Sequence, residues 1–143
     1  MIMEPPSSAH AFKVILVSPN VSEQMGGEAI KALHIYLELE SQGVPVHQVT
    51  HARVKDELSR KFPQMSVSYI PDTLIEKALY RGKLFEQFLN VIFLRSANKR
   101  VQELLADGNP AIVHFTSPIS PLLPHPRLRN ANVIIGPLNG NIH

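Results

Sequence analysis

Residues able to bind or react with a ligand occur at three places, each directly after a run of apolar residues. The first is the loop at 18–28, which follows the run at 14–17 and contains Gly26-Gly27, followed by Glu28. Paired glycines let backbone N–H groups approach a ligand, and at the start of a helix they favour an anion such as a phosphate or diphosphate. The alternative is a helix start that requires glycine for its conformation alone. No dinucleotide fingerprint or P-loop motif surrounds the pair, so the sequence does not identify a nucleotide loop.

The second place is the end of the apolar run at 111–115. His114 could act as a general base, or donate to a substrate hydroxyl, because imidazole exchanges protons near physiological pH. The alternative is a hydrogen-bonded structural histidine within a buried strand. Thr116 and Ser117 follow the strand and are better placed to meet a ligand.

The third place is the segment after the apolar run at 132–135. It contains Pro137, Leu138, Asn139 and Gly140, in which Gly-Pro and Asn-Gly are turn dipeptides. The segment is therefore either a tight turn or a loop that meets a ligand. If the strands before the three loops lie side by side, all three loops converge on one cleft.

Other candidate sites are weaker. His47 and His51 have the spacing of a helical metal pair, but in a strand this spacing separates them by roughly 13 Å, so we expect no metal site and no cofactor. Basic side chains could form a surface for anionic lipid, or a mixed and solvated face interrupted by acidic residues. These basic residues are Arg53, Lys55, Arg60, Lys61, Arg81, Lys83, Arg95, Lys99 and Arg100.

Composition limits what kind of protein this is. The 143 residues, 44% of them apolar, suit one core, and a net charge of +2 with 18% charged residues does not suggest a nucleic-acid partner. The absence of cysteine excludes disulfides and thiol nucleophiles. No apolar run approaches the length of a membrane span, and no signal peptide opens the chain. We expect a cytoplasmic protein, with peripheral contact at the inner membrane face if the basic residues meet anionic lipid.

Hydrophobic periodicity predicts the elements that must position these residues. We expect a flexible arm over 1–11 and one domain over 12–143. Helices are predicted at 28–42, at 54–62 and over 74–105, the last with Gly82 as a break, and Gly43 as a left-handed cap after the first. Strands are predicted at 14–17, 44–50, 67–70, 111–115 and 132–135. This order predicts an open, mostly parallel α/β sheet with helices on both faces.

Several segments together resemble the N-terminal half of a GT-B glycosyltransferase of the large retaining family 4. KVILVS at 13–18, MGGEA at 25–29 and QGVPV at 42–46 are similar to the family's first strand, Gly-Gly loop and second strand. AIVHF at 111–115 is similar to its "D-I-V-H" strand, and VIIGPLNG at 133–140 to the "GPLNGG" of a bacterial subgroup. The resemblance implies a Rossmann-like domain and covers nearly the whole predicted domain.

The resemblance also implies a function. Such domains bind a glycan or lipid-linked acceptor, and a second domain with an E-x7-E motif binds the nucleotide-sugar donor, as in cell-surface polysaccharide synthesis. Gly26 and Gly27 would lie near the diphosphate, and the loops at Thr116-Ser117 and 137–140 would line the acceptor side. Two departures matter: Thr116 stands where many members have a second histidine, and Asn141 replaces the last glycine of the motif. The 143 residues are expected to be inactive alone.

Two other functions stay open at this point. The chain could be a non-catalytic, Rossmann-like binding or assembly module, or a nucleotide-binding domain in its own right. A domain face intended for a partner domain could also self-associate when left alone.

Overall fold

A computed structural model describes residues 12–71, 86–116, 128 and 131–136, and contains one five-stranded sheet. Every neighbouring pair of strands is parallel, in the order β3-β2-β1-β4-β5. The strands are β1 (Lys13–Val17), β2 (Val46–His51), β3 (Val67–Ile70), β4 (Ala111–Phe115) and β5 (Ala131–Ile135). The predicted α/β, Rossmann-like open sheet is confirmed, and the described sheet is entirely parallel.

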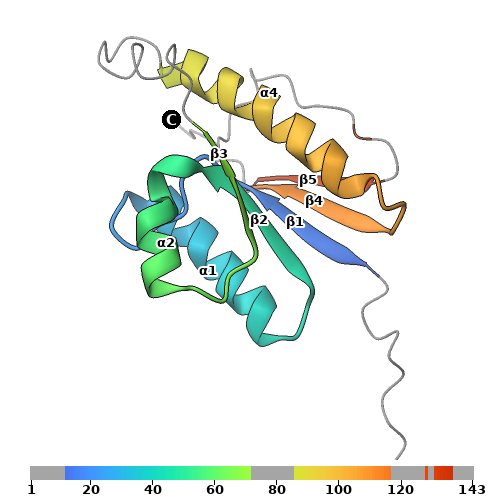
Figure 1. Ribbon diagram of the computed structural model, residues 1–143, viewed down its shortest axis with the longest axis horizontal. Helices are drawn as coiled ribbons and strands as arrows, with labels where there is room; N and C mark the ends of the chain where they lie inside the picture. Colours follow the sequence, from blue (N-terminus) through green and yellow to red (C-terminus); the bar gives the residue numbers. More distant parts are fainter. Residues whose placement is uncertain (1–11, 72–85, 117–127, 129–130, 137–143) are drawn as a thin grey trace, which may run out of the picture.

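Helices lie on both faces of the sheet, as predicted (Figure 1). Helix α1 (Gly27–Ser41) and helix α2 (Lys55–Lys61), with the short 3-10 helix η1 (Ala52–Val54) before it, lie on one face. Helix α4 (Glu86–Leu105) lies on the other. The core between α4 and the sheet joins every strand to this helix, and its largest buried side chains are Ile15, Phe93 and Phe115.

The start of β2 differs from the prediction because of how α1 ends. Gly43 has φ of 76° and donates to the Glu40 carbonyl over 3.0 Å, while Val44 donates to the Leu39 carbonyl over 3.1 Å. These are the paired bonds of a left-handed helix cap, which confirms the predicted role of Gly43. Since Val44 is used by the cap, the strand begins at Val46 and not at residue 44, and it continues to His51.

The other bounds agree closely with the sequence. Strands β3 and β4 occupy the predicted residues, β5 begins one residue early, and α1 begins at Gly27 instead of Glu28. Helix α4 falls within the predicted 74–105, whereas Gly82 and the arm over 1–11 lie outside the described residues. Within the described ranges, none of the helices has the length and apolarity needed to cross a bilayer.

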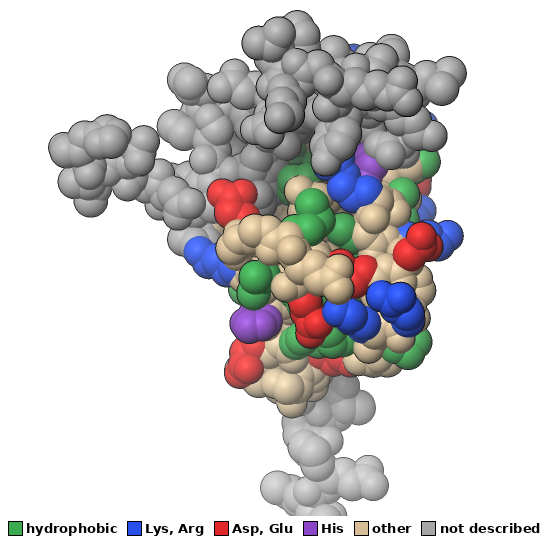
Figure 2. Space-filling view, turned by 90° about the vertical axis from the view of Figure 1, so that its left-hand side faces the viewer, with side chains coloured by type: hydrophobic (Ala, Val, Ile, Leu, Met, Phe, Trp, Pro, Cys, Tyr) green, Lys and Arg blue, Asp and Glu red, His purple; other side chains and the backbone are tan. Residues whose placement is uncertain are grey.

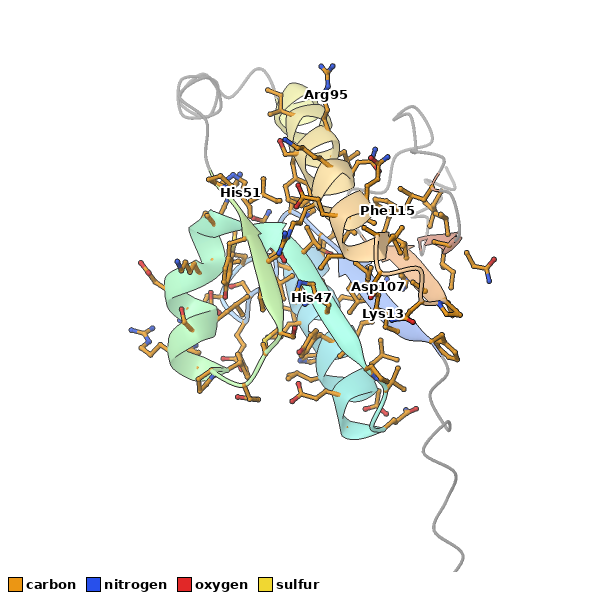
Figure 3. All side chains as sticks on the ribbon, turned by 45° about the vertical axis from the view of Figure 1, so that its right-hand side comes forward. Lys13, His47, His51, Arg95, Asp107 and Phe115 are labelled. Atoms are coloured by element: carbon orange, nitrogen blue, oxygen red, sulfur yellow. The ribbon has the colours of Figure 1, made fainter. Side chains whose placement is uncertain are left out.

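One ion pair fixes the amino end of the sheet to the end of α4. The Lys13 ammonium donates to the Leu104 carbonyl over 2.7 Å and to the Asp107 carboxylate over 2.6 Å, and Figure 3 shows Lys13 and Asp107 side by side. The hydrogen bond from Lys13 lowers the pKa of Asp107 below its usual value. The opposite, carboxyl end of the sheet carries the loops predicted to bind a ligand.

Candidate functional site

The ends of β1, β4 and β5 lie side by side, as the hypothesis of a common cleft requires. Strand β1 pairs with β4, and β4 pairs with β5. The Thr116 amide donates to the Val17 carbonyl over 3.1 Å, and the Gly136 amide donates to the Phe115 carbonyl over 3.0 Å. The residues that follow the three strands are therefore held together at the carboxyl end of the sheet.

The Thr116 hydroxyl faces the neighbouring strand. It is buried and shares a short hydrogen bond with the Ser18 hydroxyl, which is buried as well. Because burial hides both oxygens and each has a partner, this pair joins the ends of β1 and β4. The sequence suggested a side chain placed to meet a ligand, and in the structure its hydroxyl is bonded to Ser18.

His114 has a structural partner. Its Nε2 lies 2.7 Å from the Gly136 carbonyl oxygen. A carbonyl only accepts, so Nε2 must carry the proton, and Nδ1 is the nitrogen left to accept one. Gly136 has φ of 123°, a backbone conformation that favours glycine. The bond therefore joins β4 to the glycine that follows β5, as in the structural alternative for this histidine.

The loop between β1 and α1 is held in place by α2. The Ser22 hydroxyl donates to the Glu57 carboxylate over 2.7 Å and accepts from the Gln24 amide over 2.9 Å. A second oxygen of Glu57 accepts from the Glu23 amide over 2.9 Å. These bonds fix the backbone shortly before Gly26, so the start of α1 is presented by a rigid support.

The start of α1 is open to solvent. Gly26, Gly27 and Glu28 are exposed, and Gly26, at the N-cap position, has no side chain with which to cap the helix. A Cβ placed on Gly26 or on Gly27 would meet no described atom within 4 Å. The glycines are thus not required by local crowding, and the space above them would admit a ligand that approaches the first backbone N–H groups of the helix.

Asn20 adds a polar atom at the same carboxyl end of the sheet. Its Oδ1 is buried and has no hydrogen-bond partner among the described residues. Buried oxygens without a partner are uncommon and costly, and they often mark a place where a ligand or water binds. Residues Ser117, Pro137, Leu138, Asn139 and Gly140 lie outside the described residues, so their proposed contacts stay predictions.

The two histidines of β2 have separate surroundings. His47 bonds through Nδ1 to the Ser66 hydroxyl over 2.6 Å and through Nε2 to the Ser68 hydroxyl over 2.7 Å. Burial, followed by repulsion from Arg100 and Lys13, lowers its pKa below the usual value. His51 lies at the other end of the strand, with its ring 6.4 Å from that of Phe93 (Figure 3). Over the described part of the chain, no three acidic or histidine side chains are grouped to hold a metal ion.

Basic side chains on α2 and η1 belong to a mixed surface. Arg53, Lys55, Arg60 and Lys61 are exposed, and the Lys61 ammonium pairs with the Glu23 carboxylate over 3.0 Å. Figure 2 shows acidic and basic side chains interspersed on this side of the molecule. The described face therefore has the solvated, mixed character that was the alternative to a lipid-binding surface.

Sequence reasoning missed two contacts, one of them made by Arg100, which the sequence indicated only as a surface cation. Glu57 supports the glycine loop from 35 residues away, and Arg100 of α4 bonds to Ser68 of β3 from 32 residues away. No local pattern marks either contact, since each joins residues that are distant in the sequence.

No protein-family model, no curated protein and no solved structure matches this chain.

Proposed function

We propose that this chain is the acceptor-side domain of a retaining glycosyltransferase similar to family 4. The observation that supports the proposal best is the convergence of the β1, β4 and β5 ends beside an uncapped helix start with two open glycines. In a parallel α/β sheet, ligands bind beyond the carboxyl ends of the strands. The sequence resemblance supplies the reaction class, and the nucleotide-sugar would be bound by a second domain.

The proposed division of roles has a physical basis. Transfer of a glycosyl group develops positive charge on the sugar and negative charge on the departing diphosphate. Backbone N–H groups at the start of α1, together with the helix dipole, would stabilise the diphosphate. The loops after β4 and β5 would hold the acceptor hydroxyl, and closure of the two domains would exclude water as a competing acceptor.

The first test compares chain lengths. We expect the coding sequence after His143 to encode a second α/β domain with an E-x7-E motif. The longer protein should transfer radiolabelled sugar from a nucleotide-sugar, and the 143-residue chain should not. Absence of a second domain, or turnover by the short chain, would contradict the proposal and favour the non-catalytic module.

The second test uses a matched pair at one position. Gly27→Asp places a carboxylate in the first turn of α1, where it repels a diphosphate while favouring the helix dipole. Gly27→Asn adds nearly the same volume without the charge, and Gly27 has room for either. In the longer protein we expect Gly27→Asp to lower kcat/KM about 100-fold and Gly27→Asn less than about tenfold. Equal losses would show that volume, and not anion binding, matters at Gly27.

A further inference from the structure

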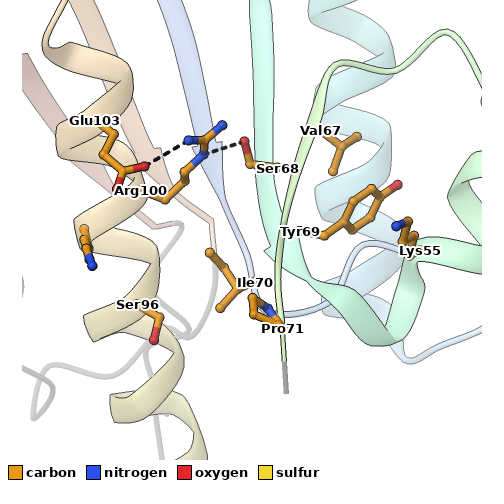
Figure 4. A pocket seen from close by; sticks show the side chains of 10 residues that line it. Lys55, Val67, Ser68, Tyr69, Ile70, Pro71, Ser96, Arg100 and Glu103 are labelled. Atoms are coloured by element: carbon orange, nitrogen blue, oxygen red, sulfur yellow. Dashed lines mark hydrogen bonds and ion pairs between the residues drawn. The ribbon is translucent and has the colours of Figure 1, made fainter. Parts of the chain in front are cut away.

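A hollow of about 670 Å³ lies at the outer edge of the sheet, away from the glycine loop. Strand β3 passes through the middle of it, with α4 on one side and the start of α2 on the other (Figure 4). Its size is that of sites for small molecules. Because β3 is the last strand of the sheet, the hollow is open along a strand edge.

The lining of the hollow is predominantly basic. Lys55, Lys99 and Arg100 line it, against the single carboxylate of Glu103. The Lys55 ammonium lies 5.8 Å from the centre of the Tyr69 ring, and Lys99 makes no ion pair with any described residue. Cations that exceed the carboxylates in a concave site raise the local concentration of anions.

Arg100 is held in a defined orientation. Its Nε donates to the Ser68 hydroxyl over 3.0 Å, and one terminal nitrogen pairs with the Glu103 carboxylate over 2.9 Å. Ser68 is buried and is itself bonded to His47 over 2.7 Å. A guanidinium fixed in this way keeps further N–H donors for a second anion, and fixing it beforehand lowers the entropy cost of binding.

Hydroxyl and apolar groups complete the hollow. Ser96 of α4 and Ser68 and Ile70 of β3 line the α4 side of the hollow, and Val67 and Tyr69 line the opposite side of the strand, next to Lys55 (Figure 4). Hydroxyls donate to phosphate oxygens, and an aromatic ring offers a surface for the body of a ligand. The hollow thus combines positive charges that attract an anionic group with apolar surface for the rest of the ligand.

We propose that this hollow binds a soluble, phosphate-bearing small molecule, with the phosphate between Lys99, Arg100 and Ser96 on the α4 face of β3 and the rest of the ligand extending over the outer edge of the strand towards Tyr69. The site is separate from the glycine loop and does not depend on the proposed glycosyl transfer. A dissolved ligand needs only this local group of donors, whereas a bilayer needs a broad basic surface, and acidic side chains interrupt the basic ones on the side of the molecule that Figure 2 shows.

The test uses inorganic pyrophosphate as the probe and the 143-residue chain. Calorimetry should give saturable binding, and the amide resonances of Ser68, Ser96 and Lys99 should move in the titration. Lys99→Gln should weaken binding about tenfold, because it removes one cation. Lys99→Gln together with Arg100→Gln should weaken it about 100-fold, because two cations are lost. Lys31→Gln, an exposed change on α1, should leave the affinity within about twofold.

A second matched pair guards against a variant that loses its fold. Ser96→Asp adds a negative charge to the lining and should weaken pyrophosphate binding about tenfold, while Ser96→Asn should change it less than about threefold. The amide resonances of Ser68, Ser96 and Lys99 report on the hollow, whereas those of Gly26 and Gly27 report on the glycine loop, so failure here and failure of the glycosyltransferase proposal are distinguishable. Equal affinity for all variants, absence of binding, or binding only to vesicles of anionic phospholipid would overturn the proposal.

Discussion

The carboxyl edge of the sheet and the hollow beside β3 offer a ligand different groups. At the carboxyl ends of the strands, two polar side chains that the sequence singled out are used by the protein itself: Thr116 bonds to Ser18 and His114 to Gly136. What faces outward is the backbone at the start of α1. In the hollow, charged side chains line the open space. The comparison teaches that a polar residue at the end of a strand can be used to join the strands of the sheet, while charged residues elsewhere on the surface stay open to solvent.

The two regions also differ in what supports them. The carboxyl ends of β1, β4 and β5 are fixed by strand pairing. The hollow depends instead on α4, which forms one of its walls and packs on the sheet through Phe93. Phe93→Ala should therefore lower the free energy of unfolding by about 3–5 kcal/mol in urea denaturation, since it leaves a large cavity. The exposed Arg95→Ala on the same helix should change it by less than about 0.5 kcal/mol. A loss below about 1 kcal/mol for Phe93→Ala would mean that α4 is not anchored as described.

The next prediction concerns the hydroxyls of Ser18 and Thr116 at the carboxyl ends of β1 and β4. Thr116→Val removes one hydroxyl with little change of shape and leaves Ser18 buried without its partner, so the free energy of unfolding should fall by about 1–3 kcal/mol. Ser18→Ala should lower the free energy of unfolding by less in the Thr116→Val variant than in the unmodified chain. A double-mutant cycle measures this difference. Independent, additive losses would contradict a structural role for the pair.

The smallest effect is expected from His47, which lies behind the wall of the hollow. Its pKa is lowered by burial and by the charges of Arg100 and Lys13, so the unfolded chain binds the proton more readily. This histidine should make the protein less stable as the pH falls through 6.5, its usual pKa, and the loss should level off below the folded-state pKa.

The measurement is urea denaturation from pH 8 to pH 5 for the unmodified chain and for His47→Gln. The difference between the two curves should change with pH, whereas His34→Gln, on the exposed face of α1, serves as the control. If His47→Gln and His34→Gln alter the pH dependence equally, burial of His47 has no part in it.

The sequence was sufficient for the fold because its signals are local. Apolar runs such as 111–115 and turn residues such as Gly43 act within a few positions, so strand bounds and the helix cap could be inferred from neighbours alone. The one clear shift, at the start of β2, arose where the cap of α1 claimed Val44. Local signals can compete for one residue, and only the structure decides which prevails.

The sites were less predictable because their partners are distant in the chain. The helix start at Gly26 and Gly27 could be predicted because it is a local feature, whereas binding of a ligand there stays a prediction. Whether Thr116 faces a ligand depends on Ser18, 98 residues away, and the hollow combines α2, β3 and α4. No spacing rule connects such residues, so neither the hydroxyl pair nor the basic hollow could be inferred beforehand.

The position of β1 in the sheet has a consequence for synthesis of the chain. One flank pairs with β2, which follows after a single helix, and the other pairs with β4, whose end lies 98 residues later. Contacts so far apart in sequence close late and slow the folding of a domain. While the chain emerges from the ribosome, β1 therefore keeps one row of backbone N–H and C=O groups unpaired, among apolar side chains, until β4 arrives. During that interval this edge is the natural target for a chaperone and the first place at which nascent chains would aggregate.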